Sequence, residues 1–175
     1  MLLTKTTEIA IQCLVLLSRM PKGTLITPQP ISMTLGSSES YTSKILRTLA
    51  KADMLESHRG ASGGFSLARE PSDITLLEVV EACEGAIIGN HCREFPDPDM
   101  LSRTCGFHQA MVEFQEGVKS LLRKWSIEDL ATKPLSTPED APDCKLRRIL
   151  DAENTLPRRN HDNNLLNQPR IQPLR

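Results

Sequence analysis

The sequence is poor in aromatic residues, in long apolar runs and in net charge. Its 175 residues include four Phe, one Tyr and one Trp, an aromatic content of 3%. A core would therefore consist mainly of aliphatic side chains, which favours helices over a β-sandwich. The longest apolar run, residues 9–17, is interrupted by Gln12 and is too short to span a bilayer. We therefore expect no membrane segment.

The formal net charge is only −1, which excludes a globally basic protein. If the protein binds DNA, its positive charge must be concentrated locally. The five cysteines cannot all pair in disulfides, because their number is odd. No charged leader with a cleavage site precedes the first apolar run, so we expect a reducing, cytoplasmic location. We find no nucleophile–base pair and no phosphate-binding loop, and therefore expect no enzymatic activity.

Three helical patterns followed by a hairpin make up the first half of the chain. Apolar residues recur at helical spacing over residues 4–20, 27–36 and 38–52, and Gly36 provides a tight turn between the second and third. Two extended runs then flank the glycine-rich residues 60–64. This order is typical of a winged helix-turn-helix, so we predict a mainly α fold with a small β-wing.

Two further helices are expected in the second half. Thr75 and Glu78 form a capping-box pattern at the start of a helix that ends at Gly85. Apolar residues three and four apart then form a seam along a longer helix, the pattern of helices that pair with one another. The seam consists of Phe107, Met111, Phe114, Val118, Leu121 and Trp125. A short helical pattern over residues 126–131 follows it.

Composition divides the chain into four segments. After Thr132 the sequence has six prolines and no aromatic residue, which indicates a disordered tail. We expect a DNA-binding domain over residues 1–85, a cysteine-containing sensor loop over 86–105, a dimerisation helix over 106–132 and the tail over 133–175.

The outer face of the 38–52 helix offers side chains suited to DNA. It carries Ser40, Ser43, Lys44, Arg47 and Lys51. Hydroxyls near a helix N-terminus can contact base edges or phosphates, and Lys and Arg suit the phosphate backbone. Tyr41 can either donate to a phosphate or pack inward. Arg59 directly precedes the glycine tip, where a side chain can enter a minor groove.

A cluster of metal-binding residue types occupies residues 90–108. Cys105 and His108 lie one helical turn apart, so both can point at one ion or cluster together with Cys92. Thiolates exclude an oxygen-only calcium or magnesium site. The alternative is that the three residues are unrelated. Cys13 and Cys83 lie on inward-facing apolar stripes, so we expect both to be buried.

Residues 37–70, and above all the stretch from Arg59 to Leu67, resemble the family of winged-helix regulators that includes IscR, NsrR, RirA and CymR. The resemblance covers roughly residues 1–132. It implies a homodimer paired through the long helix and bound to a palindromic operator in double-stranded DNA. It also implies that Arg59 is the wing arginine, and that Ser40, Tyr41, Ser43 and Lys44 occupy recognition-helix positions.

Many members of that family hold a [2Fe-2S] or [4Fe-4S] cluster on three loop cysteines. Cys92 and Cys105 match the first and last, but residues 96–99, Pro-Asp-Pro-Asp, occupy the region of the middle one. His108 matches a ligating histidine of the iron–sulfur biogenesis regulator, and Glu8 lies where some relatives use an acidic ligand from the partner subunit. The resemblance thus implies a mixed [2Fe-2S] centre on these four residues. Apart from the resemblance, the sequence favours Glu8 as a surface carboxylate on an amphipathic helix.

Three functions remain open. The first is a homodimeric transcriptional regulator that senses redox, nitric oxide or iron–sulfur status through the cluster. The second is a cluster-free repressor that responds to thiol oxidation or a small ligand. The third is a winged-helix module that binds proteins and not DNA.

Overall fold

A computed structural model describes residues 3–60, 63–85 and 106–132. The expected sensor loop, with Cys92 and Cys105, and the expected tail lie outside these residues. Element order is three helices, a two-stranded hairpin, a short 3₁₀ turn and three more helices. The predicted fold class, mainly α with a small β-wing, is confirmed. Within the described ranges, no helix is long and apolar enough to cross a membrane.

Helix α1 (Lys5–Ser18) is the centre of the core. Ala10, Cys13, Leu14 and Val15 are fully buried, because α1 is packed against α3, α4 and α6. Burial on several sides explains why the sequence of α1 is almost continuously apolar. The Thr4 side chain caps the helix by accepting a hydrogen bond from the backbone N–H of Thr7.

Helices α2 (Pro28–Leu35) and α3 (Glu39–Lys51) form the helix-turn-helix. Gly36 ends α2 in the left-handed conformation at φ 62°, as its position in the sequence predicted. The Ser38 side chain caps α3 by accepting from the Tyr41 N–H at 3.3 Å. Thr27 precedes α2 but makes no side-chain capping bond.

The wing consists of β1 (Leu55–His58) and β2 (Gly64–Leu67), paired antiparallel with Leu55 opposite Leu67. Ile26 pairs with Phe65 on the other edge of β2 through two backbone hydrogen bonds of 2.8 and 3.0 Å. A Cβ on Gly64 would lie 2.7 Å from the Ile26 carbonyl oxygen, closer than van der Waals contact allows. Glycine is therefore required there by close backbone approach.

After the 3₁₀ turn η1 (Pro71–Asp73), helix α4 (Leu76–Glu84) begins at the predicted capping box. The Glu78 carboxylate accepts from the Thr75 N–H at 2.8 Å and from Arg69 at 2.9 Å. Burial opposes ionisation of Glu78, but these hydrogen bonds outweigh it and lower its pKa. Gly85, at φ 81°, ends α4.

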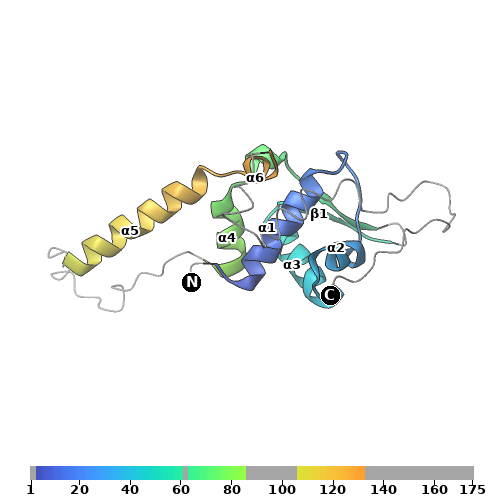
Figure 1. Cartoon of the computed structure of the whole chain (residues 1–175), viewed down its shortest axis with the longest axis horizontal. Coiled ribbons are helices and arrows are strands. Elements are labelled where there is room, and N and C mark those ends of the chain that lie inside the picture. The colour runs from blue at the N-terminus through green and yellow to red at the C-terminus, as the bar shows by residue number, and fades with distance from the viewer. Residues whose placement is uncertain (1–2, 61–62, 86–105, 133–175) are drawn as a thin grey trace, which may run out of the picture.

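Helix α5 (Gly106–Arg123) projects away from the winged helix, and α6 (Ile127–Thr132) returns to it (Figure 1). The junction between α5 and α6 is held by two backbone hydrogen bonds, Leu76 N–H to Trp125 C=O at 2.8 Å and Ile127 N–H to Ile74 C=O at 2.9 Å. The Ile127 side chain is fully buried in the core. Helix α6 thus packs on the same core as α1.

Candidate nucleic-acid interface

The two faces of α3 differ in chemistry. Ile45, Leu46 and Leu49 are buried at 1% exposure or less and fix the helix against the core. On the opposite face, Ser40, Lys44, Arg47 and Lys51 are exposed, and Ser43 is half-buried. Among the described residues, none of the three cations has an ion-pair partner. Their charges are therefore available to an external polyanion.

Tyr41 is turned toward the body of the protein. Its side chain is half-buried and packs against the core, and its hydroxyl lies 2.8 Å from the Thr6 hydroxyl on α1. Of the two roles expected for Tyr41, the inward one agrees with this geometry. The Thr6 partner was not predictable from local sequence signals, because the two residues are 35 positions apart.

The wing presents Arg59 at the end of β1, where its side chain is exposed. On the same strand His58 Nε2 lies 3.4 Å from the Glu56 carboxylate and 3.4 Å from the Ser66 hydroxyl. The Glu56 carboxylate therefore lies close to His58 within the wing. Arg59 has no ion-pair partner among the described residues.

Glu8 is the one predicted metal ligand whose side chain the structure describes. Its side chain is 44% exposed and forms an ion pair with Lys5 at 2.8 Å. Gln12, which is buried, donates to the other carboxylate oxygen at 3.2 Å. Within residues 3–60, 63–85 and 106–132 no three potential metal ligands gather at one point. His108 lies in the first turn of α5.

The cysteines at the α1–α4 contact differ in burial. Cys13 is fully buried as predicted, and burial, followed by the neighbouring Cys83, raises its pKa to about 12. The expectation that Cys83 is also buried was wrong, because it lies near the end of α4 and is only half-buried. Burial still raises the Cys83 pKa, although the Thr7 hydroxyl opposes this. Both thiols are therefore protonated at neutral pH and are weak nucleophiles.

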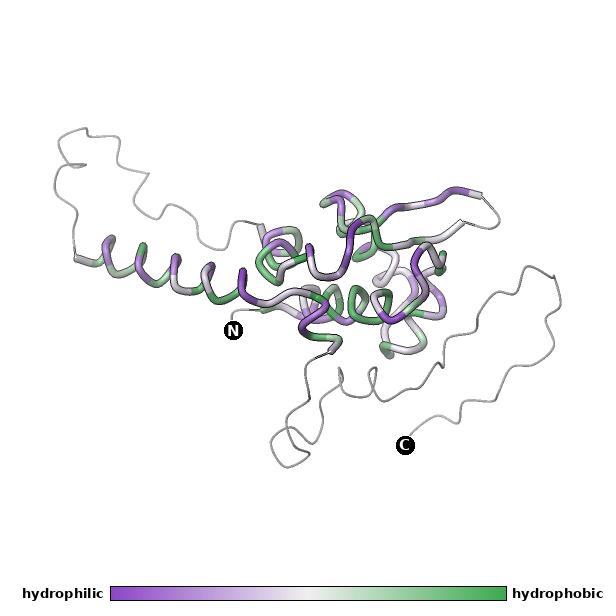
Figure 2. The backbone as a smooth tube through the Cα atoms, turned by 90° about the horizontal axis from the view of Figure 1, so that it is seen from above, coloured by the Kyte–Doolittle hydropathy of each residue, from purple (hydrophilic) through white to green (hydrophobic). Residues whose placement is uncertain are grey.

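Helix α5 exposes part of its apolar seam. Phe107 is 66% exposed, Phe114 49% and Leu121 57%. Hydrophobic and hydrophilic segments alternate along α5, whereas most of α1 is hydrophobic (Figure 2). Large apolar side chains exposed in a row on one helix mark an interaction surface.

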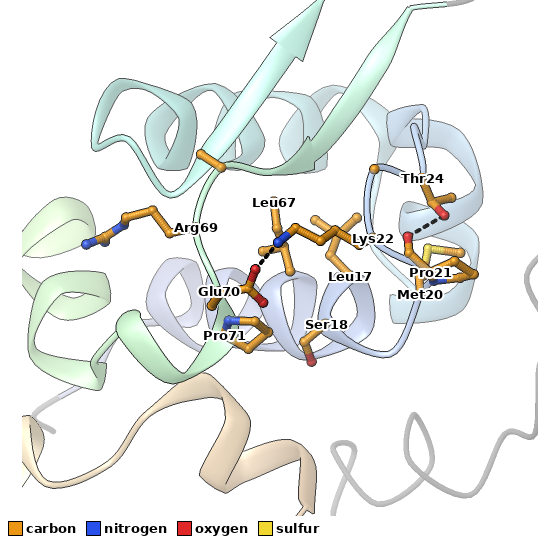
Figure 3. A pocket seen from close by; sticks show the side chains of 12 residues that line it. Leu17, Ser18, Met20, Pro21, Lys22, Thr24, Leu67, Arg69, Glu70 and Pro71 are labelled. Carbon is orange, nitrogen blue, oxygen red and sulfur yellow. Dashed lines mark hydrogen bonds and ion pairs between the residues drawn. The ribbon is translucent and has the colours of Figure 1, made fainter.

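A pocket of about 150 Å³ lies between the end of α1 and the segment after β2 (Figure 3). Lys22 and Glu70 form an ion pair within it, and this pair raises the pKa of Lys22. Arg69 points out of the pocket and binds Glu78 on α4. Because these charges are already paired, the pocket offers no free cation to an anionic ligand. It is separate from the exposed face of α3.

Comparison with known proteins gave matches over most of the chain. A sequence profile of the Rrf2 family, described as iron-dependent transcriptional regulators, matches residues 3–133. YwgB of Bacillus subtilis, named as an HTH-type transcriptional regulator, is 45% identical over 78 residues, which are 45% of this chain and 50% of that protein. Protein aau3 of Rhizobium meliloti is 33% identical over 138 residues, covering 74% of this chain and 84% of that protein.

Two further matches bear on the fold and on the kind of regulator. The HTH-type transcriptional regulator NsrR of Geobacillus kaustophilus is 29% identical over 138 residues, covering 74% of this chain and 89% of that protein. The solved structure of CymR, the global cysteine regulator of B. subtilis, superposes with a TM-score of 0.60 at 23% identity. It covers 76% of this chain and 98% of that one.

Proposed function

The chain belongs to the Rrf2 family of transcriptional regulators, and from this premise we propose that it binds operator DNA as a homodimer and is controlled through residues 86–108. The observation that carries the proposal is the positive charge of Lys44, Arg47 and Lys51 on α3, unpaired within the described residues, together with the exposed Arg59 of the wing. In this arrangement α3 enters the major groove with Ser40 and Ser43 at the bases. Arg59 enters the adjacent minor groove.

The DNA test uses a duplex that the protein itself selects from a random-sequence library. Arg59→Ala should weaken binding to the selected duplex by about 10- to 100-fold and reduce discrimination against random DNA. Arg19→Ala is the matched control, because Arg19 is also exposed but caps the C-terminal end of α1 and belongs neither to α3 nor to the wing. Equal affinities for the two variants, with no dependence on salt, would favour a protein-binding module instead.

We propose that Cys92, Cys105, His108 and Glu8 hold an iron–sulfur cluster, as in our reading of the sequence. Two thiolates, an imidazole and a carboxylate form a donor set suited to a [2Fe-2S] centre, which when bound would supply one-electron redox chemistry. The half-exposed Glu8 carboxylate supports this role, because buried Gln12 fixes its orientation while the carboxylate still faces solvent. The family's description as iron-dependent agrees with it.

The cluster test is the visible spectrum of protein purified without oxygen, with iron and sulfide assayed on the same sample. We expect a coloured protein with about two irons and two sulfides per subunit. Glu8→Ala should reduce iron occupancy, whereas Lys5→Ala should not, because it removes the ion pair and leaves the carboxylate. A colourless protein with a reversible Cys92–Cys105 disulfide would instead support the thiol-responsive alternative.

A further inference from the structure

The first turn of α1 is hydrogen-bonded to the last turn of α4. The Glu84 carboxylate oxygen Oε1 accepts from the Thr4 backbone N–H at 3.2 Å. The same oxygen also accepts from the hydroxyls of Thr4 and Thr7. These bonds lower the pKa of Glu84, so it remains ionised at neutral pH. Three donors on one carboxylate oxygen tie the end of α4 to the start of α1.

The same turn of α1 is also bonded to the DNA-reading helix. Thr6 lies between Thr4 and Thr7, and its hydroxyl meets the Tyr41 hydroxyl at 2.8 Å. Tyr41 belongs to the first turn of α3, between Ser40 and Ser43. Side chains of adjacent residues on one helical turn therefore contact α4 and α3 separately.

Glu84 lies where α4 leads into the expected sensor loop. Gly85 follows it as the cap of α4, and the expected sensor loop begins at residue 86. Glu84 is thus the last residue of α4 and lies two positions before the loop. Thr7, one of its two partners, is fully buried and adjoins Glu8. A displacement of the end of α4 would therefore first affect the hydrogen bonds from Thr4 and Thr7 to Glu84.

We propose that Glu84, Thr7, Thr6 and Tyr41 form a relay that couples the end of α4 to the orientation of α3. When Glu84 leaves Thr4 and Thr7, the first turn of α1 loosens and Thr6 no longer holds Tyr41. The first turn of α3, which carries Ser40 and Ser43, then becomes more mobile. The four residues are positioning residues. The inference deepens the proposed function and depends on it for the link to DNA.

Hydrogen–deuterium exchange on the full chain tests the relay without DNA or cluster. Glu84→Ala should speed amide exchange over residues 42–48 by about threefold or more, although Glu84 makes no hydrogen bond to α3 within the described residues. Glu81→Ala is the matched control, one turn earlier on α4 and exposed. Glu84→Gln, which keeps an accepting oxygen, should restore part of the protection. If exchange rises only over residues 3–8, the relay is wrong.

Non-additivity gives the second readout. Tyr41→Phe removes the hydroxyl and keeps the ring, so it should raise exchange in α3 as Glu84→Ala does. The double variant should then show no more exchange in α3 than Tyr41→Phe alone, because both break one pathway. Additive increases in exchange would show that the Glu84 and Tyr41 hydrogen bonds stabilise α3 independently, and would overturn the proposal. If Glu84→Ala fails to fold, Thr7→Val removes the same hydroxyl partner at nearly constant volume.

DNA affinity gives the third readout. On the selected duplex, Tyr41→Phe and Glu84→Ala should each lower affinity severalfold, and the double variant should lower it no further than Tyr41→Phe alone. Additive losses of affinity would mean that the Tyr41 hydroxyl contacts DNA independently of Glu84, which would overturn the relay at α3. If the wild-type protein binds no duplex, the proposed function fails, while the exchange experiment still decides whether the relay exists.

Discussion

Cys13 and Cys83 are neighbouring thiols on α1 and α4 with different access to solvent. Because burial raises the pKa of Cys13 to about 12, this thiol is neutral at every physiological pH. We expect iodoacetamide at pH 8.5 to leave Cys13 unmodified in the native protein and to modify it fully in urea. Peptide mass spectrometry would measure both cysteines. Native labelling of Cys13 at the rate seen in urea would contradict its burial in the core.

Gly64 lies at a close backbone approach between the wing and Ile26. Gly64→Ala would force its Cβ against the Ile26 carbonyl oxygen, so it should lower the free energy of unfolding by about 1–3 kcal/mol. Gly117→Ala in α5 is the control, because nothing lies within 4 Å of the added Cβ. That change should leave stability equal or raise it by about 0.5–1 kcal/mol. Urea unfolding measures both, and equal effects would show that Ile26 moves aside freely.

At the scale of elements, α5 exposes more large apolar side chains than any other described helix. Leu121→Glu should raise the dissociation constant of the proposed dimer about 100-fold, or ~2.8 kcal/mol, by placing a charge in the seam. Ser120→Glu adds the same charge at an exposed position beside the seam and should change the dissociation constant little. Sedimentation equilibrium distinguishes the two. Equal dissociation constants for the two variants would mean that the dimer interface does not include Leu121.

The elements themselves were predictable where their signals are local. Gly36 ends one helix, and Thr75 and Glu78 start another within four residues, so the sequence contains each whole signal. The bonds from Glu84 to Thr4 and from Tyr41 to Thr6 were not predictable, because tertiary packing alone brings together residues 80 and 35 positions apart. The half-exposure of Cys83 was missed for a related reason. The apolar stripe shows which face turns inward, but not how far the neighbouring helix extends.

At the scale of the whole molecule, α6 makes the end of the described chain part of the winged-helix core. Ile127→Ala should cost about 2–5 kcal/mol, because the side chain is fully buried against α1 and η1. Fluorescence of Trp125, the single tryptophan, and far-UV circular dichroism should then shift together. The exposed Glu128→Ala is the control, expected within about 0.5 kcal/mol of wild type. A shift in fluorescence alone would mean that α6 unfolds separately.

The length of α5 makes it a lever with its pivot at Trp125. Eighteen helical residues span about 27 Å, so a sideways shift of about 2 Å at Gly106 turns the helix about its pivot by only roughly 4°. Conversely, a rotation of one degree at Trp125 moves Gly106 by about 0.5 Å over that same length. The backbone bonds from Leu76 to Trp125 and from Ile127 to Ile74 restrict that rotation. In the proposed dimer, these bonds would therefore limit how far the two DNA-binding domains can turn relative to each other.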